Sequence, residues 1–229
     1  AGLVAGFVIL LMQRKQRHER GQLELNRLRS AALSVQIDHH FLANNISKIT
    51  LMNQKGLYDR ASEFGLYFTR FLQRNMRFLR ADFVSLEEEL ELIRSYVAME
   101  NVTSKNIQLD ITKEDGLDPA KMMVLPFLLQ PLIENAVKYG PRSTDQHTTS
   151  VLVNIHCHDE LLSISVVNEV EQDSMRGNEG HHLALTIIRD RLKIIGGRSE
   201  IVVNKMVGRF QALILIDLKK INIKKKDEN

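Results

Sequence analysis

The spacing of apolar residues changes near residue 104, and this change constrains the fold more than any other feature of the chain. Between residues 18 and 49 the apolar side chains recur every three or four positions, which is the pattern of a helix in a coiled-coil seam. Residues 59–80 and 85–103 keep the helical spacing. After residue 106 the pattern alternates between apolar and polar side chains, as in a half-buried strand. The sequence therefore predicts an α+β protein, in which a helical bundle precedes a domain that contains a sheet.

Two local signals refine the helical half. Ser85 is followed three residues later by Glu88, which is the arrangement of a capping box at the start of the third helix. In the second helix four aromatic residues recur at seam spacing, and we expect this stripe to pack against the first helix. These residues are Phe64, Phe68, Phe71 and Phe78.

The second half of the chain predicts a two-layer α/β sandwich. Alternating runs and turn residues indicate mostly antiparallel strands, which are accompanied by helices. The expected elements are a strand at 107–111, a hairpin of 151–156 with 161–167, a helix at 183–195, and closing strands at 200–203 and 209–216. We place the domain boundary between Asn101 and Asn106, with a helical domain over residues 13–103 and the sandwich over residues 104–218. The basic residues 219–229 are expected to form a solvated tail.

The first twelve residues are apolar and carry no charge. A membrane-spanning helix needs about 20 such residues. Because the sequence does not begin with Met, we interpret residues 1–12 as the inner end of a transmembrane helix; an N-terminal core helix or a signal-peptide remnant is the alternative. The basic cluster that follows places the downstream residues in the cytoplasm by the positive-inside rule. This cluster comprises Arg14, Lys15, Arg17 and Arg20.

Composition excludes several classes of protein. An apolar content of 44% is too high for a disordered chain, and 229 residues are enough for two modest domains. The single cysteine, Cys157, excludes an intrachain disulfide. The net charge of +3 is small and the basic residues gather near the two ends, so we expect no direct contact with nucleic acid.

Residues 130–140 place three polar side chains on an otherwise apolar helix. Polar groups on such a helix need partners. Asn135 can offer an amide oxygen to Mg²⁺, Lys138 can meet a phosphate, and Glu134 can hold or relay a proton. The set suits a nucleoside triphosphate. The alternative is a buried helix in which Glu134 and Lys138 form an ion pair four residues apart.

A second motif lies upstream, at residues 36–45. It resembles the phospho-acceptor box of LytS-type sensor histidine kinases, usually written Q-I-N-P-H-F-L-F-N, and His40 aligns with the histidine that carries the phosphoryl group. Asp38 and His39 stand where the family usually has Asn and Pro. Residues 125–140 are similar to the family's nucleotide-binding N box, and the resemblance covers about residues 23–217.

The resemblance implies the ATP-binding fold of gyrase-type ATPases, with ATP and Mg²⁺ as cofactors. It assigns Mg²⁺ to Asn135, help with a proton or water to Glu134, the phosphate border to Lys138 and Tyr139, and the adenine side to Asn168. A degenerate glycine box adds Gly180, His182 and Leu185 to the predicted ATP site. Asn168 stands in place of the aspartate that is usual in histidine kinases, whereas His182 and Ala184 replace two glycines.

The function that this resemblance implies is a sensor histidine kinase of a two-component system. The kinase would phosphorylate its own His40 with ATP and transfer the phosphoryl group to an aspartate of a response regulator, often one with a LytTR-type DNA-binding domain. We expect a homodimer attached to the bacterial cytoplasmic membrane. Two alternatives are a catalytically weak pseudokinase that serves as a dimeric scaffold, and a membrane-anchored ATPase or protein-binding module without histidine transfer.

Overall fold

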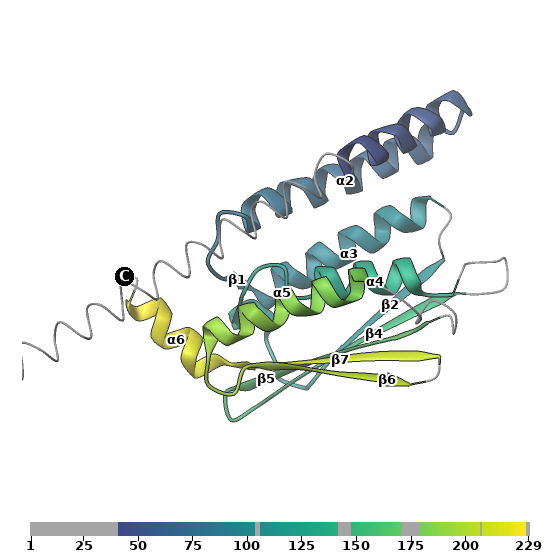
Figure 1. Cartoon of the computed structure of the whole chain (residues 1–229). Helices are drawn as coiled ribbons and strands as arrows, with labels where there is room; N and C mark the ends of the chain where they lie inside the picture. The colour runs from purple at the N-terminus through teal and green to yellow at the C-terminus, as the bar shows by residue number, and fades with distance from the viewer. Residues whose placement is uncertain (1–40, 104–105, 142–147, 171–178, 207, 228–229) are drawn as a thin grey trace, which may run out of the picture. The chain divides into compact units, whose positions relative to one another are not determined.

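The computed structural model describes residues 41–103, 106–141, 148–170, 179–206 and 208–227 (Figure 1). The chain divides into two compact units, and the boundary along the chain falls between Leu51 and Met52. Of the first unit the structure describes residues 41–51, which are helical, as predicted for this part of the first helix. His40 and most of the predicted coiled-coil seam lie outside the described residues. The domain boundary expected between Asn101 and Asn106 stays a prediction.

The second unit begins with two helices that pack side by side, α2 (Tyr58–Phe78) and α3 (Leu86–Val102) (Figure 1). The predicted aromatic stripe is buried, but its ring contact with a neighbouring helix is to α3 and not to the first helix as expected: the Phe71 and Tyr96 rings lie 5.8 Å apart. Burial of such rings is the main source of stabilisation between the two helices. The stripe consists of Phe64, Phe68, Phe71 and Phe78.

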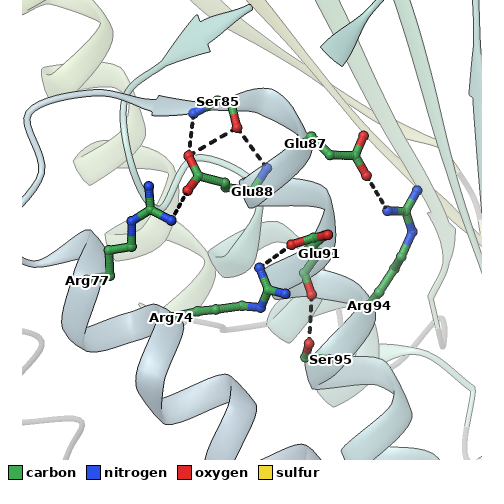
Figure 2. Close-up of polar contacts among 8 residues, drawn as sticks. All are labelled: Arg74, Arg77, Ser85, Glu87, Glu88, Glu91, Arg94 and Ser95. Atoms are coloured by element: carbon green, nitrogen blue, oxygen red, sulfur yellow. Dashed lines mark hydrogen bonds and ion pairs between the residues drawn. The ribbon is translucent and has the colours of Figure 1, made fainter. Parts of the chain in front are cut away.

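Polar contacts flank this apolar seam (Figure 2). Arg74 and Arg77 of α2 form ion pairs with Glu91 and Glu88 of α3. The predicted capping box is confirmed: the Ser85 N–H donates to Glu88 Oε2 at 2.9 Å, and the Glu88 N–H donates to Ser85 Oγ at 3.3 Å. Glu88 therefore both caps α3 and ties it to α2.

A five-stranded sheet follows, in the order β2-β4-β5-β7-β6. Strand β2 pairs with β4 in parallel, and the other pairs are antiparallel, as the sequence largely predicted. In the β4–β5 hairpin, Asp159 and Glu160 form the turn with φ values of +49° and +57°, which suits a two-residue hairpin loop. The strands are β2 (Ile107–Lys113), β4 (Thr149–His158), β5 (Leu161–Glu169), β6 (Glu200–Met206) and β7 (Arg209–Asp217).

Helices α4 (Gln130–Tyr139) and α5 (Glu179–Ile195) lie with α3 over one face of this sheet (Figure 1). Alternate strand residues such as Val153, Ile164 and Ile214 are fully buried on that face. The expected two-layer α/β sandwich is therefore present. Helix α5 starts four residues earlier than predicted, at Glu179.

Three features differ from the sequence-based expectations. Short strands β1 (Val84–Ser85) and β3 (Met123–Val124) pair and join the start of α3 to the sandwich. A 3-10 turn, η1 (Pro119–Lys121), precedes β3. The expected solvated tail contains a helix, α6 (Leu218–Asp227), because Ile221 is buried while the lysines occupy other positions.

No helix in the described ranges combines the length and the apolar character that crossing a bilayer requires. The apolar segment predicted to end a membrane span, residues 1–12, lies outside those ranges.

Candidate nucleotide-binding site

Helix α4 carries the polar residues that the sequence singled out. It starts after Leu129, has Pro131 in its first turn, where the missing N–H is not needed, and ends before Gly140. Four apolar side chains anchor it against the rest of the unit: Leu132, Ile133, Ala136 and Val137. Glu134 and Asn135 lie between these apolar positions and are held on a fixed element.

The end of α4 lies directly against strand β4. A Cβ atom added to Gly140 would come within 2.6 Å of both the Ala136 carbonyl oxygen and Thr149 Cγ2. Only glycine therefore allows this approach without a shift of the helix or the strand. The close contact fixes the height of α4 above the sheet, and with it the position of Asn135.

Asn135 has a buried amide nitrogen that finds no hydrogen-bond partner among the described residues. The amide oxygen of Gln130, one turn earlier, is also buried and unpartnered within that part of the chain. Buried polar atoms are nearly always paired in folded proteins. Two such atoms on one helix fit a site in which a polar ligand completes the bonding.

Glu134 lies between α4 and α3. Its Oε1 accepts a hydrogen bond of 2.7 Å from Gln130 Nε2. Burial raises the pKa of Glu134, and the nearby Glu100 carboxylate raises it further. The same surroundings raise the pKa of Tyr96, mainly through burial. The Glu134 carboxyl group can therefore hold a proton closer to neutral pH than an exposed glutamate does.

Lys138 and Tyr139 lie together at the end of α4, where Lys138 Nζ is 5.1 Å from the centre of the Tyr139 ring. Lys138 is exposed. The alternative interpretation of an ion pair between Glu134 and Lys138 is wrong, because Glu134 bonds to Gln130 and Lys138 lies over the tyrosine. The ammonium group of Lys138 is therefore not neutralised by Glu134.

Asn168 lies near the end of β5 and is 4% exposed. It shares the helix-covered face of the sheet with Val166 and Ile164, and α4 packs on β4 and β5 of that sheet. The Asn168 Nδ2 donates to the Glu169 carbonyl oxygen at 2.8 Å. The structure thus brings Asn168 and the α4 residues to the same side of the sheet.

The other predicted site residues lie at the start of α5 or before the described part of the chain. Gly180 and His182 belong to the first turns of α5, and their side chains are outside the described set. Leu185 belongs to the same helix and is buried. No group of three or more metal-ligating residues of the His, Cys, Asp or Glu type occurs within the described ranges.

Comparison with known proteins shows what the chain resembles. Residues 28–107 match the family model described as histidine kinase. The chain is 28% identical over 138 residues to the sensor protein LytS of Staphylococcus saprophyticus, an alignment that covers 59% of this chain and 22% of that protein. The sensor histidine kinase/phosphatase LytS of Staphylococcus aureus is 24% identical over 180 residues, with 73% of this chain and 30% of that protein covered. The chain is therefore similar to LytS-type histidine kinases.

Two further proteins are similar to parts of the chain. The sensor histidine kinase BtsS of Escherichia coli is 27% identical to this chain over 124 residues, which are 54% of this chain and 21% of BtsS. The chain therefore spans less than a third of the length of these relatives. The catalytic domain of histidine kinase ThkA aligns with 60% of the chain at a TM-score of 0.45 and 15% identity, with 99% of that domain covered.

Sequence reasoning missed one buried carboxylate beside the candidate site. Glu89 of α3 is fully buried and accepts hydrogen bonds from the Phe127 N–H and, at 2.9 Å, from the Leu129 N–H. Burial raises the pKa of Glu89 to about 7, although these hydrogen bonds and the charge of Arg191 lower it in part. Glu89 lies three residues after the buried Leu86, and this helical spacing was the sequence signal that could have indicated its burial.

Proposed function

We propose that this chain is the kinase core of a two-component sensor, which phosphorylates His40 with ATP and then transfers the phosphoryl group to a response-regulator aspartate. The observation that carries the proposal is the unpartnered buried amide of Asn135, on a helix where Gln130 also has an unpartnered oxygen. Similarity to LytS-type histidine kinases supports the choice of ATP as the ligand. The match of residues 28–107 includes His40.

Asn135 is the residue that would hold Mg²⁺, because an amide oxygen is a suitable ligand for a hard cation. Rotation about the Cβ–Cγ bond exchanges its amide oxygen and nitrogen, so either atom can face the site. Mg²⁺ supplies neutralisation of the charge on the phosphate oxygens. The fit is supported by the buried, unpartnered amide rather than by a cluster of carboxylates.

Glu134 would act on a proton, whereas Lys138 would act on the negative charge of the phosphates. The raised pKa of Glu134 lets its carboxyl group hold or accept a proton near the site, and the hydrogen bond from Gln130 orients this group. The exposed ammonium of Lys138 would border the phosphates together with Tyr139. Asn168 would accept a hydrogen bond from the amine of adenine through its oxygen, because its nitrogen already donates to Glu169.

The start of α5 would complete the phosphate side of the site. Gly180 and His182 precede Leu185 in the first turns of this helix, and backbone N–H groups at a helix start attract phosphates. The imidazole of His40 would be the nucleophile, because one ring nitrogen of a neutral imidazole carries a free lone pair.

We further propose that the kinase acts as a homodimer, attached through residues 1–12 to the bacterial cytoplasmic membrane. Exposed apolar side chains on α2 support a second copy as the occupant of this surface: Tyr58 is 68%, Leu66 51% and Met76 55% exposed. The apolar run followed by basic residues supports membrane attachment. The expected transfer partner is a response regulator, with a LytTR-type DNA-binding domain as the favoured kind.

Phosphorylation of the purified kinase with γ-labelled Mg-ATP tests the transfer. We expect acid-labile phosphate on the wild type and none on His40→Ala. Absence of acid-labile phosphate from the wild type would leave the pseudokinase scaffold as the better reading. ATP turnover that persists unchanged in His40→Ala would instead favour the ATPase.

Binding of a fluorescent ATP analogue with Mg²⁺ tests the site. Asn135→Ala should weaken binding about tenfold or more, since it removes the proposed ligand of the metal. Asn204→Ala is the matched control, because Asn204 is exposed on the edge strand β6. Equal affinities for the wild type and both variants would remove α4 from the nucleotide site.

A further inference from the structure

The turn that leads into α4 is held by side chains from three different helices. Residues 125–129 connect β3 to α4, and Leu129 is the N-cap residue of α4. Phe127 in this turn has a φ of +61°, a left-handed conformation that residues with a Cβ atom seldom adopt. An unfavourable backbone conformation persists only where its surroundings hold it.

Glu89 of α3 provides the main polar restraint on this turn. One carboxylate oxygen accepts from the Phe127 N–H and the other from the Leu129 N–H, at 2.9 Å. Leu129 has no polar side chain with which to cap its own helix, so Glu89 supplies the missing acceptor from another helix. The carboxylate also lies at the positive end of the α4 dipole.

The other two helices act on the same turn. The Arg191 guanidinium of α5 donates to the Pro126 carbonyl oxygen and lies 5.9 Å from the centre of the Phe127 ring. That ring packs edge-on against Phe78, the last residue of α2, at 5.3 Å. Helices α2, α3 and α5 therefore converge on the peptide units that place the start of α4.

We propose that Glu89 is a positioning residue for nucleotide binding, which sets the start of α4 and through it the position of Asn135, and that this turn links α2 and α3 to the nucleotide site. The proposal rests on the nucleotide role assigned to α4 above. Glu89 touches neither the nucleotide nor Mg²⁺ in this scheme. It acts through the backbone of residues 127–129.

The protonation state of Glu89 gives the proposal a distinctive readout. The ionised carboxylate accepts both N–H groups, whereas the protonated form loses acceptor capacity at one oxygen. Because burial raises the pKa of Glu89 to about 7, the two forms exchange near neutral pH. The charged side chain that acts on Glu89 within the described ranges is Arg191 of α5; the turn contributes N–H groups, and α2 reaches the turn through the uncharged Phe78.

Glu89→Gln in the full chain is the test, because it keeps the size of the side chain and removes its charge. We expect the dissociation constant of the fluorescent Mg-ATP analogue to rise about tenfold at pH 8, where the wild-type carboxylate is ionised. The wild-type affinity should fall as the pH is lowered through about 7, and the variant should lack this transition. Glu87→Gln is the matched control, since Glu87 lies on the same helix but is partly exposed and pairs with Arg94.

Two further measurements separate this proposal from the proposed function. If Asn135→Ala abolishes analogue binding while Glu89→Gln keeps the wild-type affinity and pH profile, the positioning role of Glu89 is refuted and the nucleotide site stands. If Asn135→Ala leaves the affinity for the analogue unchanged, α4 has no role in nucleotide binding. Glu89 then cannot influence nucleotide affinity through α4. Hydrogen exchange then reports on the restraint itself, because Glu89→Gln should speed exchange of the Leu129 amide and Glu87→Gln should not.

A second variant covers the case in which Glu89→Gln does not fold. Arg191→Gln leaves the carboxylate in place but removes the cation that stabilises its ionised form. The midpoint of the pH transition in analogue affinity should therefore move upward in Arg191→Gln. A midpoint unchanged from the wild type would overturn the proposal.

Discussion

Replacing Gly140 with alanine should destabilise the second unit, because the new methyl group has no space. Its carbon would lie 2.6 Å from the Ala136 carbonyl oxygen and 2.6 Å from Thr149 Cγ2, about 1 Å closer than van der Waals contact. Neither neighbour moves easily. The Ala136 oxygen accepts the Gly140 N–H at 2.8 Å, and Thr149 is 3% exposed with its hydroxyl bonded to the Pro141 oxygen at 3.1 Å.

The expected magnitude combines two opposing effects. Overpacking of this kind costs about 1–3 kcal/mol. Loss of glycine's freedom in the unfolded chain returns about 0.4–1 kcal/mol. The net decrease in the free energy of unfolding should therefore be about 1–2 kcal/mol, which corresponds to a fall in Tm of about 2–4 °C per kcal/mol for a chain of this size.

Thermal and urea unfolding of the full chain provide the assay. Gly65→Ala is the control, because Gly65 is inside α2 and an added Cβ there meets nothing within 4 Å. We expect this control to gain about 0.5–1 kcal/mol, so the same chemical change should have opposite signs at the two positions. Thr149→Ser keeps the hydroxyl and deletes Cγ2, and in this background part of the Gly140→Ala loss should be recovered. Stabilisation by Gly140→Ala equal to that of Gly65→Ala would refute the packing argument.

Three further predictions concern α3 and its neighbours. Ser85→Ala removes the capping box and should lower the free energy of unfolding by about 1 kcal/mol in urea titrations; an unchanged midpoint would show that the cap is dispensable. Between the unfolded pKa of 4.5 and the folded pKa of about 7, the buried Glu89 carries a proton in the folded state only. The free energy of unfolding of the wild type should therefore fall by about 3 kcal/mol as the pH rises through this window, and Glu89→Gln should lack this loss. Parallel curves of stability against pH for the two proteins would contradict this prediction. A double-mutant cycle of Arg74→Ala with Glu91→Ala should give a coupling energy below about 1 kcal/mol, because both side chains are partly exposed; a coupling of several kcal/mol would contradict this account.

The elements that the sequence predicted well are those with a local cause. The capping box needs only Ser85 and Glu88, three residues apart, and the β4–β5 hairpin needs only alternation on both sides of a polar turn. The aromatic stripe of α2 follows from helical spacing alone. In the candidate site, helical spacing also predicted the helix at residues 130–140, which the structure shows as α4. Lys138 is exposed on this helix.

The features that the sequence did not reveal depend on distant contacts. Glu89 is one of three consecutive glutamates, and its role emerges only when the turn that contains Phe127, 38 residues later, packs over it. The left-handed backbone of Phe127 has no local signal, because phenylalanine does not favour it. Strands β1 and β3 are two residues long, too short for alternation to be recognised. Helix α6 was missed because its many lysines obscure the buried Ile221 in the sequence pattern.

The pairing of α2 with α3 divides its contacts by depth, and this division governs how the pair responds to ionic strength. Added electrolyte screens exposed charges, and the Arg77 side chain, which pairs with Glu88, is 70% exposed. The phenylalanines Phe64, Phe71 and Phe78 are buried, and screening does not weaken apolar burial. The two helices should therefore stay together in dilute and in concentrated electrolyte alike.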